Sequence, residues 1–388
     1  MGYRKVVVTL SLLLLVSLAG CGGGGGGGSA GNGNGGSGGN GGPPDTTAPT
    51  VSQMSPGEDV SGVGTNGKLT VTFSEAMTPA AINGANFRLT NGVVAVPGTV
   101  TFDAANHIAV FEPTNSLAPD TRYTATMVTG IKDLAGNPLA NDFAWCFVTG
   151  PGADASAPGV ASTVPAGAVS GVAVNRSVVA TFSADMDSSS ITSANFTLTG
   201  PSAVAVPGTV SYGRRTAVFA PSGALAANAT YTASIGTGVR GLTGLPLPAR
   251  VSWSFVTGAA GDANAPVVVA VSPASAASGV AIGQPVSVTF SEPMNPITMT
   301  TANLVVTTPG AAGAAARPVT GTVSFDVATN TATFVRINHL TTPVAFHLTP
   351  VSNLEPNTTY TATLGTGAKD LAGNALAESK VWSFTTAP

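Results

Sequence analysis

Apolar and polar residues alternate along most of the chain with a period of two. Residues 69–73 read Leu-Thr-Val-Thr-Phe, and residues 123–127 read Tyr-Thr-Ala-Thr-Met. Alternation of this kind, rich in β-branched residues, predicts strands with one buried face. About seven such runs in each 100 residues, separated by Gly, Pro and Asn, favour an immunoglobulin-like β-sandwich. No long stretch has a helical period, although Thr78–Gly84 is compatible with a single helical turn.

The same sequence boxes return three times along the chain. Residues 72–77 read Thr-Phe-Ser-Glu-Ala-Met and have counterparts at 181–186 and 289–294. The spacing of roughly 108 residues is that of a whole domain, because solenoid repeats are much shorter. We therefore predict an all-β chain with three tandem Ig-like domains, at residues 45–150, 151–258 and 259–388.

A corner sequence in each repeat supports the sandwich. Leu117–Tyr123 returns in related form at 225–231 and 354–360. A tyrosine that enters a strand after such a corner can hydrogen-bond to the backbone a few residues upstream, as in the tyrosine corner of Ig-like folds. For these tyrosines and for the tryptophan that closes each repeat, we predict core packing.

The N-terminus has the pattern of an export signal. Two basic residues, Arg4 and Lys5, precede an apolar run that is too short to span a bilayer. Residues 18–21, Leu-Ala-Gly-Cys, resemble the lipobox of bacterial lipoproteins, which implies a signal peptide at 1–20 and lipid attachment at Cys21. An ordinary secretory signal with a chance cysteine is the alternative. Residues 22–44 are nearly all Gly, Asn and Ser, a composition typical of a flexible tether.

Taken together, the repeated motifs resemble a known family. The Asp-x-x-Ala-Pro openings, the Phe-Ser-Glu-x-Met box, the Asp-Leu-Ala-Gly-Asn turn at 133–137 and the closing Trp-x-Phe resemble the SbsA-type bacterial Ig-like domains of S-layer and other surface proteins. The resemblance covers about residues 45–388 and implies a sandwich fold in a structural or adhesive context. The second repeat departs from it, with Gly241 where the other repeats have Asp133 and Asp370.

Composition narrows the function classes. Only 9% of the residues are charged and the net charge is −3, so there is no basic surface for nucleic acid. The three histidines form no metal motif, and no Gly-x-Ser-x-Gly nucleophile elbow occurs in the three repeats. We therefore predict that the chain is not an enzyme. Cys146, the only other cysteine, has Ser254 and Ser383 as repeat equivalents, and we expect a partly exposed thiol.

Acidic residues recur at equivalent turns of the repeats. If strands alternate in direction, Asp45, Glu75 and Asp133 share one end of the first domain, where carboxylates could bind calcium. The alternative is that they only cap turns. The full set of candidate calcium ligands is Asp45, Glu75, Asp133, Asp154, Asp185, Asp262, Glu292 and Asp370.

The third repeat carries two insertions, around Thr308–Pro318 and within Val335–Asn353. Inserted loops on a rigid scaffold often bind ligands, and a harmless surface insertion is the alternative. The candidate ligand-binding residues are Arg336, His339, Phe346 and His347.

These patterns predict a cell-envelope lipoprotein, in the outer membrane or at the cell surface, that acts as a spacer or adhesin. The expected partners are the membrane, through the lipid, and a polysaccharide or surface protein. A structural S-layer or cell-wall role, or an accessory subunit presenting a secreted enzyme, stays open as the alternative.

Overall fold

The computed structural model describes residues 45–310, 316–337 and 353–388. These belong to one compact unit, Asp45–Pro388. The predicted signal peptide, Cys21 and the Gly-rich segment lie outside the described residues. Among the described residues, no helix has the length and apolar character needed to cross a bilayer.

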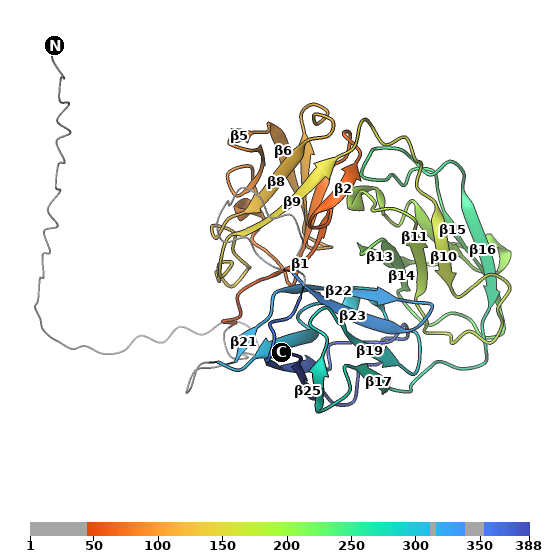
Figure 1. Cartoon of the computed structure of the whole chain (residues 1–388). Helices are drawn as coiled ribbons and strands as arrows, with labels where there is room; N and C mark the ends of the chain where they lie inside the picture. Colours follow the sequence, from red (N-terminus) through yellow and green to blue (C-terminus); the bar gives the residue numbers. More distant parts are fainter. Residues whose placement is uncertain (1–44, 311–315, 338–352) are drawn as a thin grey trace, which may run out of the picture. The chain divides into compact units, whose positions relative to one another are not determined.

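The first repeat folds into two sheets (Figure 1). One sheet has the strand order β1 (Val51–Ser55), β3 (Leu69–Phe73), β7 (Ile108–Pro113) and β6 (Gly98–Asp103). The other has the order β2 (Val60–Val63), β9 (Phe143–Thr149), β8 (Arg122–Met127), β4 (Phe87–Asn91) and β5 (Val94–Ala95). The chain changes sheets between β1 and β2, because β1 pairs antiparallel with β3 whereas β2 pairs parallel with β9.

The second repeat has the same plan. Its first sheet has the order β10 (Val160–Val164), β11 (Val178–Phe182), β14 (Thr216–Pro221) and β13 (Gly208–Gly213). The second sheet contains β12 (Phe196–Thr199), β15 (Thr230–Ile235) and β16 (Val251–Val256).

The third repeat follows the first closely. Its first sheet has the order β17 (Val268–Ser272), β19 (Val286–Phe290), β23 (Thr331–Arg336) and β22 (Gly321–Asp326). Its second sheet has the order β18 (Ala277–Val280), β25 (Lys380–Thr386), β24 (Thr359–Leu364), β20 (Leu304–Thr308) and β21 (Arg317–Pro318). The predicted fold of tandem β-sandwich domains is therefore confirmed.

The helical content of the described residues is limited to short 3₁₀ turns. Each repeat has one after its second long strand: η1 (Pro79–Ala81), η2 (Ser188–Ser190) and η4 (Pro296–Thr298). A further turn, η3 (Pro201–Ala203), occurs only in the second repeat. The first of these is the single helical turn predicted within Thr78–Gly84.

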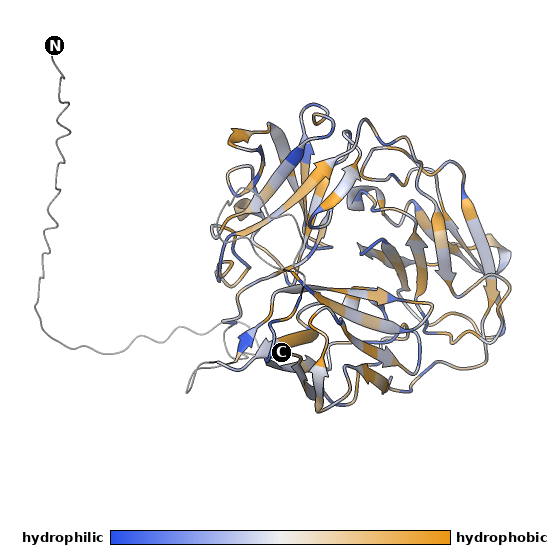
Figure 2. Cartoon of the chain, viewed as in Figure 1, coloured by the Kyte–Doolittle hydropathy of each residue, from blue (hydrophilic) through white to orange (hydrophobic). Residues whose placement is uncertain are grey.

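Alternation along the strands places the cores between the sheets. In β8, Tyr123, Ala125 and Met127 are buried, while the threonines between them are only partly covered. Trp145 and Phe147 of β9 are fully buried in the same core. Figure 2 shows orange segments alternating with pale ones along the strands. The period-two pattern therefore gave the correct face for these residues.

The tyrosine corner is present in every repeat. The Tyr123 hydroxyl accepts a hydrogen bond from the Ala118 N–H at 2.8 Å. Tyr231 and Tyr360 accept the equivalent bonds from Ala226 and Glu355, both at 2.7 Å. This prediction is confirmed.

The expectation of a partly exposed Cys146 is wrong. Its side chain is buried, although it lies on the face of β9 opposite Trp145. The loop before β2 folds over this position, where Asp59 N–H donates to the Cys146 carbonyl at 2.7 Å. Thr124 Oγ1 also lies 3.4 Å from the sulfur. The sheet has no open outer face here, because β2 adds to its edge and brings this loop with it.

Candidate functional site

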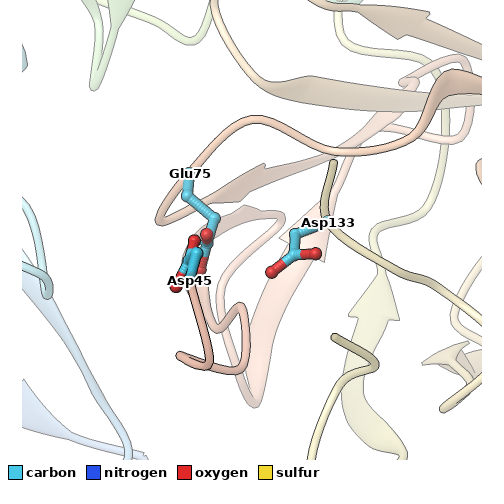
Figure 3. A group of neighbouring side chains, drawn as sticks. All are labelled: Asp45, Glu75 and Asp133. Atoms are coloured by element: carbon cyan, nitrogen blue, oxygen red, sulfur yellow. The ribbon is translucent and has the colours of Figure 1, made fainter. Parts of the chain in front are cut away.

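Three carboxylates of the first repeat come together at one end of the sandwich. Asp45 precedes β1, Glu75 follows β3, and Asp133 lies in the loop between β8 and β9. Each offers an oxygen within 4.8 Å of the others. Figure 3 shows Asp45 and Glu75 close together with Asp133 across from them. The three residues converge because of the sandwich fold: β1 begins, β3 ends and the chain passes from β8 to β9 at the same end of the domain.

Asp133 also holds its own loop together. Its Oδ1 accepts from the Asn137 N–H and its Oδ2 from the Asn137 side-chain amide, both at 2.8 Å. The same amide donates to the Asp45 carbonyl at 3.2 Å. The turn-capping interpretation of Asp133 is thus realised in the structure. It does not prevent cation binding, since a carboxylate oxygen has two lone pairs.

The electrostatics of this cluster favour a bound cation. Burial, followed by the negative charges of Asp133 and Asp45, raises the pKa of Glu75 to about 7. Burial acts to raise the pKa of Asp133 as well, but hydrogen bonds from Asn137, Gly136 and Ala135 lower it overall. In the described part of the chain, no basic residue contributes to the pKa of Glu75.

The third repeat assembles an equivalent cluster, but with a cation beside it. Oxygens of Asp262, Glu292 and Asp370 also lie within 4.8 Å of one another. Burial, then Asp262 and Asp370, raises the pKa of Glu292, while Arg176 of the second repeat acts in the opposite direction. Burial lowers the pKa of Arg176 itself against the pull of these three carboxylates. The acidic cluster of the third repeat therefore has a counter-charge from the second repeat of the same chain.

The second repeat has no such cluster among the described residues. Gly241 replaces the loop aspartate, and Asp185 is paired with a guanidinium instead. Arg215 donates to Asp185 through Nε at 3.1 Å and Nη2 at 3.0 Å. The side-chain Oδ1 of Asp154 accepts a local hydrogen bond from the Ser156 N–H at 2.8 Å. These two candidate ligands are therefore not brought together with a third acid.

Chemically, the first cluster is suited to a hard cation. Carboxylate and backbone oxygens are the ligands that calcium prefers, and calcium takes six to eight of them. Asp45, Glu75 and Asp133 would be the protein ligands in the first repeat, and Asp262, Glu292 and Asp370 those in the third. Calcium binding by these residues stays a prediction.

The candidate ligand-binding residues lie mostly outside the described residues. His339, Phe346 and His347 fall within 338–352. Arg336 ends β23, where its Nη2 pairs with Glu355 Oε1 at 2.7 Å and its Nη1 donates to the Asn353 carbonyl at 2.7 Å. It lines a cavity of about 180 Å³ together with Gln284, Phe334, Val335 and Leu354.

Contacts between successive repeats were not anticipated from the sequence. The amide of Asn66 pairs with the backbone of Asp154, at 3.1 Å to its carbonyl and 2.8 Å from its N–H. Asn175 makes the same pair of bonds with Asp262, both at 2.8 Å. The repetition of Asn at equivalent positions of two repeats, followed by Gly283 in the third, was the available signal.

Comparison with known proteins agrees with the repeat structure. The family model described as bacterial Ig-like domain matches residues 45–149, 154–257 and 262–386. No protein with a curated description matches the sequence.

The solved structures that the chain matches include bacterial and vertebrate proteins. The bacterial S-layer protein SbsC, in a structure titled rSbsC(31-844), shows 15% identity over 88% of this chain and 54% of that one, with a TM-score of 0.23. Its N-terminal part gives 15% identity, 54% and 44% coverage, and a TM-score of 0.22. The FN1–FN3 domains of chicken CNTN1 give 12% identity, 88% and 98% coverage, and a TM-score of 0.19. The chain spans about half the length of the SbsC chains that it matches.

Proposed function

Because the chain belongs to the family of bacterial Ig-like domains, we propose that it is a non-enzymatic, lipid-anchored protein of the cell envelope that acts as a surface spacer or adhesin. The observation that carries the proposal is the arrangement of three tandem β-sandwiches after an N-terminal sequence that resembles a lipoprotein signal. Domains of this kind support many functions, so the role has to be argued from particular sites.

The anchor is supported by sequence alone. A charged start, a short apolar run and Leu-Ala-Gly-Cys ending at Cys21 resemble a lipoprotein signal, and a Gly-rich segment separates this cysteine from the first sandwich. Several acyl chains hold a protein on a membrane much more firmly than one. The proposed location is the outer membrane or the cell surface.

The proposed adhesin site is the cavity at the end of β23. Its wall combines apolar Phe334 and Leu354 with polar Gln284 and Arg336, a mixture typical of small-ligand sites. Its position also fits, because Val335, Arg336 and Leu354 of its wall lie at the two ends of the insertion predicted within Val335–Asn353. We propose a polysaccharide as the ligand, since sugars present both apolar ring faces and hydroxyl groups.

The test is binding of the soluble fragment 43–388 to arrayed bacterial and host polysaccharides. Val335 is 40% exposed on the cavity wall, so Val335→Trp should fill the cavity and reduce binding at least tenfold. Val381→Trp is the matched control, because this valine is also exposed in the third repeat but does not line the cavity. Equal loss in both variants, or no binding by the unaltered fragment, would contradict a glycan adhesin.

In that case a structural role in the S-layer or cell wall would remain, in which no ligand occupies the cavity. An accessory subunit that presents a secreted enzyme is the third candidate. A stable exported enzyme that co-purifies with the chain at fixed stoichiometry would favour it.

A further inference from the structure

The two junctions between successive repeats use equivalent loops of the second and third repeats. Leu242, in the connection between β15 and β16, accepts a hydrogen bond on its carbonyl from the Lys68 N–H of the first repeat at 3.2 Å. Leu371, in the connection between β24 and β25, accepts the equivalent bond from the Ser177 N–H of the second repeat at 2.8 Å. Both leucines are buried, at 8% and 2% exposure.

The junctions also have an apolar contact on the outward side of a sheet. Leu371 forms a cluster with Val179 of β11 and Val218 of β14, which point away from the core of the second repeat. In the first repeat, Val110 of β7 occupies the position equivalent to Val218. It is buried in the cluster centred on the second repeat.

Four positions therefore make up the face that receives the next repeat, here called the junction face. In the second repeat they are Asn175, which binds the backbone of Asp262; Ser177, which donates the N–H to Leu371; and the outward Val179 and Val218. The first repeat keeps the asparagine, the donor and one of the two valines, at Asn66, Lys68 and Val110.

In the third repeat every one of these positions is changed. Gly283 replaces the asparagine and removes both clamp bonds. Pro285 replaces the donor and has no N–H. Ser287 and Thr333 replace the outward valines with polar side chains. The third repeat thus keeps the fold but lacks the groups that hold a following repeat.

The first repeat, by contrast, keeps the loop that docks. Residues 133–137 and 370–374 have the identical sequence Asp-Leu-Ala-Gly-Asn. Leu371 of the second copy of this sequence is buried at a junction, whereas Leu134 of the first is 68% exposed. Both loops have the same internal bonds, because Asp133 and Asp370 each bind the following asparagine. Leu134 is therefore presented in the geometry that docks elsewhere in the chain.

We propose that the Leu134 loop is a docking surface for an Ig-like repeat of another polypeptide, one that has an intact junction face: an asparagine, a non-proline donor two residues later and two outward valines. A second copy of this chain does not fit, because its first and second junction faces are filled and its third is altered. The contact would be head-to-tail, as it is between repeats.

The test rebuilds the junction face on the third repeat of this chain. The variant Gly283→Asn, Pro285→Ser, Ser287→Val, Thr333→Val gives the third repeat the junction face of the second. It is made in residues 22–388 and examined by sedimentation equilibrium from about 1 to 100 µM. We expect the unaltered chain to stay monomeric and the variant to associate at least tenfold more tightly.

Leu134→Asp added to the variant should abolish this association. Val93→Asp is the matched control, since Val93 is fully exposed in the same repeat but outside the loop. If the fourfold variant does not fold by circular dichroism, Gly283→Asn with Pro285→Ser is used, because both positions are exposed. A folded variant that stays monomeric, or an association that survives Leu134→Asp, would overturn the docking surface. Association of the unaltered chain through Leu134 would overturn the exclusion of a second copy.

Discussion

At the scale of single residues, the tyrosine corner is a hydrogen-bonded motif that all three repeats share. Tyr123 is 3% exposed, and its hydroxyl is the acceptor for the Ala118 N–H. Tyr123→Phe keeps the ring but leaves this N–H without its partner, which costs about 1–3 kcal/mol where water cannot replace it. We expect the unfolding transition of the first repeat to move to lower temperature in calorimetry, with the other repeats unchanged. Tyr360→Phe should produce the same shift in the third repeat only.

The raised pKa of Glu75 predicts that the stability of the first repeat depends on pH. Its pKa is about 7 in the fold, compared with 4.5 for a free glutamate, so the folded state binds the proton more tightly. Stability from this group is therefore fully present below pH 4.5 and is lost as the pH rises to about 7. Glu75→Gln should flatten this fall in chemical denaturation measured between pH 4.5 and 7.

Glu58 is a second glutamate of the first repeat with a raised pKa, so its contribution to the pH dependence has to be measured separately from that of Glu75. Burial, with a smaller contribution from Asp59, raises its pKa to about 7 against the hydrogen bond from the Cys146 N–H. Glu58→Gln should therefore remove an independent part of the same fall, and the double variant should remove both. An unchanged pH profile in Glu75→Gln would show that the acidic cluster does not form in solution.

At the scale of elements, a basic residue from a neighbouring repeat distinguishes the two acidic clusters. Calcium should raise the Tm of the first repeat more than that of the third, because Arg176 already lies beside Asp262, Glu292 and Asp370. At a calcium concentration one hundred times Kd, the expected stabilisation is about 2.7 kcal/mol. Calorimetry of residues 45–388 with calcium or chelator measures it.

Two variants make this comparison specific. Glu75→Gln should remove most of the calcium effect on the first repeat, and Arg176→Gln should increase the effect on the third. A calcium shift that persists in Glu75→Gln would place the ion elsewhere.

At the scale of the whole molecule, the proposed lipid anchor at Cys21 predicts where the protein is found in the cell. Cys21→Ser removes the sulfur that the lipid would occupy. In the native host, the unaltered chain should fractionate with membranes and the variant with the soluble exported proteins. Ser17→Ala, a change outside residues 18–21, is the control and should leave the chain with membranes. Membrane association of the Cys21→Ser variant would contradict lipid anchoring.

Much of this protein follows from its sequence alone. The spacing of the Asp-x-x-Ala-Pro openings identified three units, and alternation around Tyr123 and Trp145 identified the buried faces, because both signals depend only on neighbouring residues. The meeting of Asp45, Glu75 and Asp133 was also predictable, since strands of alternating direction bring their ends to the same pole.

Tertiary structure decided what local patterns do not contain. Cys146 is buried because a loop closes over it, and Arg176 interacts electrostatically with three carboxylates of the next repeat. Identical loops end in opposite environments, with Leu371 covered and Leu134 exposed. The physical reason is that burial depends on which surface lies opposite a residue. That surface is set by contacts about 100 residues away in sequence, beyond the reach of a period-two pattern.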